Sequence, residues 1–226
     1  MKRIITILIL CFSVSVFSQE EKENKWILKL NTTQLIDVFS YPTVQISAER
    51  KINSYLSINA EIGYQLYDFD KKDTVFLKSR GFKTNVEGRV YLLKLLNSRT
   101  KSNRGELYVG LQLFYRKNQS TDVIDYSPKD DPTKSFTDYF GTKRTVKGFN
   151  ITAGYQISAS KRIVLEPFVG LGMMNRTIKN SDIQYNEIRD SQEGTDLVPL
   201  FQGLNLEESS GNFVNFCTGF RVGYRL

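Results

Sequence analysis

Five charged residues stand in the middle of segments that otherwise alternate between polar and apolar side chains. They are three carboxylates and two guanidinium groups: Glu61, Glu87, Arg89, Glu166 and Arg221. Buried carboxylates beside arginines often have shifted pKa values, so this set could form a proton relay or a ligand site. Opposite charges can also pair inside a narrow barrel and serve only its structure. We favour that second reading, a structural charge network in the barrel interior.

The amino-acid composition limits the chemistry open to the chain. The sequence contains no histidine, which excludes imidazole-activated nucleophiles, histidine zinc sites and histidine general bases. Cys217 has no second thiol near it to activate it and is expected to be a small buried filler. We therefore predict no catalytic, metal-binding or cofactor-binding residues, no cofactor and no enzymatic activity. No aromatic and basic motif typical of nucleic-acid recognition is present, so no nucleic-acid partner is expected.

A cluster of aspartates is the remaining candidate for metal chemistry. It occupies the region between two predicted strands and comprises Asp122, Asp125, Asp130, Asp131 and Asp138. Such oxygens could coordinate Ca²⁺, which takes six to eight oxygen ligands. No fixed ligand spacing such as that of an EF-hand loop is present. We therefore expect a solvated loop.

The elements that must position the charged residues are β-strands. From Lys25 onward, apolar residues recur at every second position, which is the period of a pleated strand with two unlike faces. We predict eight strands, at about residues 26–35, 43–51, 55–67, 81–93, 106–116, 146–158, 162–174 and 213–226. Pro167 in the seventh removes a backbone donor and predicts a bulge or a weakened pair. No segment shows a sustained helical period.

The two faces of these strands indicate which side is enclosed. One face combines glycines with the mid-strand charges, which suits a narrow barrel interior. The other is aliphatic with aromatic residues near the strand ends, as in the interfacial girdle of a membrane barrel. About 12 residues per strand at about 3.4 Å each, tilted by about 40°, reach roughly 30 Å, enough to span an apolar band about 25 Å tall.

The predicted connections differ in length, as membrane barrels require. They are short after the second and sixth strands, and run to nearly thirty residues after the fifth and nearly forty after the seventh. The connection after the fourth strand, about a dozen residues long, fits less well. It is basic, whereas the long last loop is mainly acidic. These features predict basic turns and both termini in the periplasm, with long acidic loops outside the cell.

The first residues predict export. Lys2 and Arg3 precede an apolar run of about 13 residues, followed by Val16, Phe17 and Ser18, a pattern typical of a cleaved signal peptide. The run is too short for a transmembrane anchor. We expect residues 1–18 to be removed and residues 19–226 to form a single β-barrel domain.

Two segments resemble small outer-membrane barrels of the OmpA/OmpX type, and the broad "outer membrane protein beta-barrel domain" family of bacterial barrels. They are residues 154–172, a strand, turn and strand, and the terminal residues 219–226, Gly-Phe-Arg-Val-Gly-Tyr-Arg-Leu. The resemblance implies an eight-stranded antiparallel up-and-down transmembrane β-barrel in the bacterial outer membrane. It also implies that the barrel-assembly machinery reads the last strand, although Leu226 replaces the usual terminal aromatic residue.

These features lead to an expected function. We expect a non-enzymatic integral outer-membrane protein, surrounded by outer-membrane lipid and lipopolysaccharide, whose long loops contact a surface protein or ligand. The alternative is a soluble secreted or periplasmic barrel of the lipocalin kind, with its apolar face inward around a small apolar ligand. A histidine-free lipid-acting enzyme is a third and weaker candidate.

Overall fold

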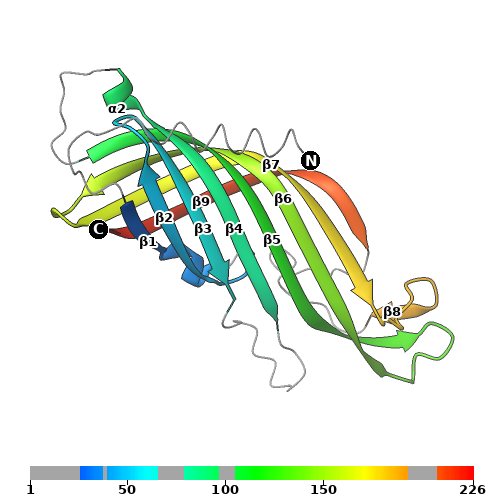
Figure 1. Cartoon of the computed structure of the whole chain (residues 1–226). Coiled ribbons are helices and arrows are strands. Elements are labelled where there is room, and N and C mark those ends of the chain that lie inside the picture. Colours follow the sequence, from blue (N-terminus) through cyan, green and yellow to red (C-terminus); the bar gives the residue numbers. More distant parts are fainter. Residues whose placement is uncertain (1–25, 38–39, 66–78, 97–104, 193–207) are drawn as a thin grey trace, which may run out of the picture.

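The computed structural model describes residues 26–37, 40–65, 79–96, 105–192 and 208–226, so the predicted signal peptide lies outside the described residues. These residues form one antiparallel sheet (Figure 1). Its elements in chain order are β1 (Trp26–Asn31), the 3-10 turn η2 (Thr33–Ile36), β2 (Val44–Lys51), β3 (Leu56–Tyr64), β4 (Arg80–Tyr91), the short helix α2 (Leu92–Leu95), β5 (Gly105–Pro128), β6 (Phe136–Ser158), β7 (Ile163–Ser181), β8 (Asp190–Gln192) and β9 (Ser209–Arg225).

The sheet closes on itself. Strands β1 to β7 pair in sequence order, β7 pairs with β9, and β9 pairs back with β1. Closure gives every ring strand two neighbours and so removes the free edges that an open sheet exposes. The prediction of an all-β antiparallel fold with eight ring strands is confirmed.

The ring is not a regular barrel, because its strands differ greatly in length. β1 has 6 residues, whereas β5 has 24 and β6 has 23. The long strands β5, β6 and β7 continue far past the ring toward the end at which β8 lies (Figure 1). We call this part the strand extension and define it as residues 120–128, 136–142 and 179–181, which lie beyond the last pairs with β4 and β9.

The strand extension corrects the prediction of a loop of nearly thirty residues after the fifth strand. β5 and β6 remain paired as far as Tyr126 and Phe136, and only residues 129–135 connect them. Two aspartates of the expected solvated loop instead accept hydrogen bonds across the hairpin: Asp125 from Thr137 and Asp122 from Thr142, both at 2.6 Å.

The connection after β7 also contains folded structure where a long loop was predicted. The Asp138 carboxylate accepts hydrogen bonds from the backbone N–H groups of Gln184 at 2.6 Å and Tyr185 at 3.0 Å. Strand β8 then pairs with the end of β5. Residues up to Gln192 are therefore held against the strand extension, while the rest of the predicted acidic loop, residues 193–207, lies outside the described residues.

Two further differences occur at strand ends. The first strand was predicted to reach residue 35, but it stops at Asn31 because Thr32 and Thr33 bond to the backbone of Phe220 and the chain turns into η2. The fourth was predicted to reach residue 93, but Leu92 begins α2. At Pro167 the pairing between β6 and β7 is interrupted without a change of register, which confirms the predicted weakened pair.

The two faces of the ring are oriented as the sequence predicts, with polar side chains inward. Buried residues of the ring strands are mostly polar or charged, whereas Leu, Ile, Val and Phe dominate the exposed outer face. Along β3, for example, burial alternates at every residue from Leu56 to Tyr64. No helix within the described ranges is long and apolar enough to cross a membrane.

Candidate functional site

The interior of the ring contains a network of seven charged side chains, which we call the interior charge network. Its members are Lys29 from β1, Glu49 from β2, Glu61 from β3, Glu87 and Arg89 from β4, Glu166 from β7 and Arg221 from β9. None of these side chains is more than 1% exposed. Three cations thus face four carboxylates in a space closed to solvent.

Arg89 links three of the carboxylates. Its terminal nitrogens lie 2.9 Å from Glu49, 2.5 Å from Glu87 and 3.0 Å from Glu166. The guanidinium carbon also lies 4.4 Å from the ring centroid of Tyr108, a cation–π contact. Arginine suits this position because its planar fork can bond several carboxylates at once.

Arg221 and Lys29 complete the pairing. Arg221 bonds Glu61 at 2.9 Å and Glu166 at 2.8 Å, and its guanidinium carbon lies 3.7 Å from the ring centroid of Phe168. Lys29 bonds both Glu49 and Glu166. Glu166 is therefore bonded to all three cations, Lys29, Arg89 and Arg221. It links the ion pairs of Arg89 with those of Arg221.

Neutral side chains satisfy the remaining carboxylate oxygens. Tyr91 donates to Glu49, and Tyr108 donates to Glu166 at 3.1 Å. Thr152 donates to Glu87 at 2.5 Å, and Asn31 donates to Glu61 at 2.8 Å. A buried charge is tolerated only when it is paired and hydrogen-bonded, and each carboxylate here meets both conditions.

Small residues make room for this network. A side-chain carbon added at Gly110 would lie 2.6 Å from the Thr152 hydroxyl and 2.9 Å from a Glu87 oxygen. Any larger residue at position 110 would therefore displace the bond between Thr152 and Glu87. This close approach explains the glycine on the inward face of β5.

The network joins all five charged residues singled out in the sequence, and it includes members that sequence reasoning missed. Lys29 and Glu49 share the polar phase of their strands, β1 and β2. Tyr91 and Tyr108 also have inward phase. Strand phase was therefore the signal that could have found these four residues.

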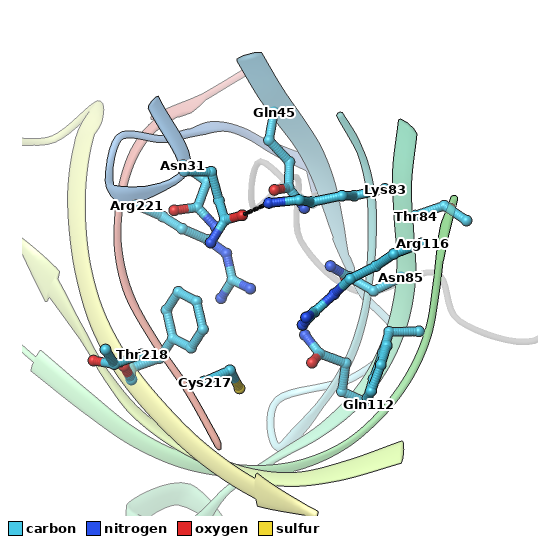
Figure 2. Close-up of a pocket in the computed structure, with 13 residues that line it drawn as sticks. Asn31, Gln45, Lys83, Thr84, Asn85, Gln112, Arg116, Cys217, Thr218 and Arg221 are labelled. Atoms are coloured by element: carbon cyan, nitrogen blue, oxygen red, sulfur yellow. Dashed lines mark hydrogen bonds between the residues drawn. The ribbon is translucent and has the colours of Figure 1, made fainter. Parts of the chain in front are cut away.

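A small polar cavity lies next to the network (Figure 2). Its volume is about 30 Å³, enough to hold water, and Arg116, Cys217 and Arg221 are among the residues that line it. On one side, the Lys83 ammonium donates to Gln34 at 2.8 Å, to Asp37 at 2.7 Å and to the Tyr41 carbonyl at 2.7 Å. The cavity has no room for an apolar ligand of lipocalin size.

At the edge of the cavity, the charge of Lys83 is balanced by the neighbouring Asp37 carboxylate. Burial alone would raise the pKa of the Asp37 carboxyl, but the Lys83 charge and hydrogen bonds from Lys83 and Ser40 hold that pKa below its ordinary value. Asp37 is therefore a stable anion that neutralises Lys83.

The other described residues that could take part in catalysis or metal binding do not form a cluster. Cys217 is a free thiol, and the Asn150 amide approaches its sulfur at 3.5 Å. Among the residues that the structure describes, no group of three or more His, Cys, Asp or Glu side chains could hold a metal ion. The charged side chains of the interior charge network are instead paired with one another.

Fold and site together define a class of protein: a closed ring of eight antiparallel strands with an apolar outer face and an ion-paired interior. Residues 4–206 match a family described as "Protein of unknown function (DUF3575)", and the chain belongs to that family. No curated protein matches the chain.

Proposed function

We propose that this protein is a non-enzymatic integral β-barrel of a bacterial outer membrane, in which the strand extension projects from the cell surface. The ring strands would cross the lipid. The turns at residues 52–55 and 159–162 would face the periplasm, together with the end of β9. The role is structural or one of surface interaction.

The observation that carries this proposal is a continuous apolar band around the outside of the ring. Cross-strand register aligns outward residues of β4 to β9 in rows, one of which contains Leu111, Ile151, Leu171 and Phe216. These four side chains are 55–65% exposed. The next row along the strands contains Val86, Leu113, Phe149, Met173 and Val214. A soluble monomer rarely exposes an apolar surface this extensive, whereas lipid requires one.

Aromatic residues mark both edges of the band. At the edge near the short turns, Trp26 contacts Arg50 and Tyr224 accepts a hydrogen bond from Arg162. At the opposite edge, the Phe82 and Tyr115 rings lie 5.7 Å apart, between centroids. Amphipathic rings and basic side chains favour the level of the lipid headgroups, so these contacts support a band bounded by two membrane interfaces.

The orientation of the faces argues against the soluble alternative. A lipocalin-like barrel needs apolar side chains around its ligand, but here the interior contains the interior charge network and the apolar side chains point outward. A structural role also agrees with the full pairing of the interior carboxylates, which leaves no unpaired general acid or base among them.

The proposed partners follow from this placement. Outer-membrane lipid and lipopolysaccharide would surround the apolar band, and the barrel-assembly machinery would recognise β9. The strand extension, with residues 182–192 held against it, would present a folded surface to a protein or ligand outside the cell.

A heat-modifiability gel tests the proposal. The full chain should migrate differently on a denaturing gel before and after boiling, because a closed membrane barrel resists detergent until it is heated. The boiled protein should also refold into phosphatidylcholine vesicles and regain its unboiled mobility. Identical mobility in both lanes, with recovery of the protein in the carbonate-soluble fraction of cells, would contradict membrane placement.

A further inference from the structure

A second group of charges lies on the outer surface, directly beyond the apolar band. Its members are Arg80 on β4, Lys117 on β5, Lys143 and Lys147 on β6, and Lys179 on β7; we call them the outer basic patch. All five have the outward phase of their strands. Four are exposed and Lys117 is half-buried.

Register places the patch against the edge of the band. Lys147 pairs with Tyr115 on one side and precedes Phe149, the next outward residue of β6. Lys117 pairs with Phe82, which belongs to the aromatic edge. The positive charges therefore begin where the apolar side chains end, at the level that lipid headgroups would occupy.

None of the five cations of the outer basic patch forms an ion pair with another described residue. The Glu208 side chain, close to this region, accepts a hydrogen bond from the Asn180 backbone N–H instead. The rows that contain the patch otherwise hold Gln, Thr, Asn and Ser residues together with the aromatic side chains of the band edge.

Two members of the patch stand directly opposite each other. Lys143 on β6 is the register partner of Lys179 on β7. Like charges in directly opposite positions destabilise a strand pair. An anion bound between them would remove this repulsion, and the phosphate group is one that lysine commonly binds.

From these observations we infer that the outer basic patch binds the phosphate groups of a membrane lipid in the outer leaflet. A phosphorylated glycolipid fits this position, because its acyl chains would lie along the apolar band while its phosphates reach the lysines. The inference rests on the proposed membrane placement and assigns a lipid class to one side of the barrel, that of β4 to β7.

The test compares lipid binding by two variants of equal charge. Full-length protein in detergent is titrated with bisphosphorylated lipid A, and bound lipid is counted by native mass spectrometry. Lys143→Gln/Lys179→Gln should bind lipid A roughly tenfold more weakly than the unmodified protein. The control, Lys134→Gln/Lys161→Gln, removes two exposed lysines outside the patch and should bind as the unmodified protein does. Dephosphorylated lipid A should not distinguish the patch variant from the other proteins.

Failure of the inference can be separated from failure of the proposed function. If every protein inserts into phosphatidylcholine vesicles and shows the gel shift, but the patch variant binds lipid A as tightly as the control, the patch does not bind lipid phosphate. Equal weakening of both variants would mean that net charge is responsible and would also overturn the inference. If the unmodified protein neither inserts nor shifts, the membrane placement itself is wrong.

Discussion

Replacing Arg89 by methionine should lower the free energy of unfolding by about 3–5 kcal/mol, the cost of removing one partner from a buried ion pair. Methionine has a similar volume, so the loss is one of charge and hydrogen bonds more than of volume. Three carboxylates lose a direct partner: Glu49, Glu87 and Glu166. Only Lys29 and Arg221 then remain to neutralise the four acids of the interior charge network.

The measurement is urea-dependent unfolding of the refolded chain in lipid vesicles, followed by tryptophan fluorescence. Arg162→Met is the matched control, because Arg162 lies in an exposed turn and bonds only at the rim. This control should change stability by less than about 0.5 kcal/mol. An Arg89→Met loss as small as that of the control would mean that the buried pairs are not formed.

A double variant separates charge pairing from packing. Glu87→Gln removes the charge that Arg89 neutralises, but the amide keeps an oxygen for the Thr152 hydroxyl. Arg89→Met/Glu87→Gln should therefore lose less stability than the sum of the two single variants, by roughly 1–3 kcal/mol. Simple additivity would show that the two residues do not interact.

The second large effect is expected on the outside of the ring. Ile151→Arg should destabilise the protein in lipid vesicles by about 2–4 kcal/mol, the cost of an arginine at the middle of a bilayer. Ile151 is 62% exposed and lies between Leu111 and Leu171 in the apolar band. At a site of similar exposure in water, the same change would alter stability by about 0.5 kcal/mol or less.

The matched control for this variant lies on the same strand and the same face. Tyr139 is 49% exposed and belongs to the strand extension, outside the apolar band. Tyr139→Arg should therefore leave the unfolding midpoint in vesicles almost unchanged. Equal effects at positions 139 and 151 would contradict a lipid-facing band.

The ring could be predicted from the sequence because each strand has two chemically different faces. Residues 56–64 are the clearest case, since every second side chain is apolar and the alternation alone identifies strand β3 and its inward residues. The strand extension could not be predicted in the same way. Residues 120–142 are rich in Asp, Lys, Ser and Thr, a composition typical of loops, and their pairing includes side-chain bonds such as Thr137 to Asp125.

The interior charge network was predictable only in part. The phase of a strand shows that Glu166 faces inward, but not which residues it meets there. Its bond with Lys29 joins residues 137 positions apart and exists only because β9 closes the ring between β1 and β7. Which residues meet across a closed sheet depends on the register of the strands and on how the sheet closes. The periodicity of residues within one strand shows neither of these.

The most direct test of the membrane placement uses the only tryptophan of the sequence, Trp26. This side chain is 44% exposed on the outer face, where it contacts Arg50 at the edge of the apolar band. In vesicles of brominated phospholipid its fluorescence should be quenched, most strongly by bromine close to the headgroups. In an Ile151→Trp/Trp26→Phe variant, the deepest bromines should quench most. Fluorescence that is insensitive to brominated lipid but quenched by acrylamide in water would show that the outer face does not contact lipid.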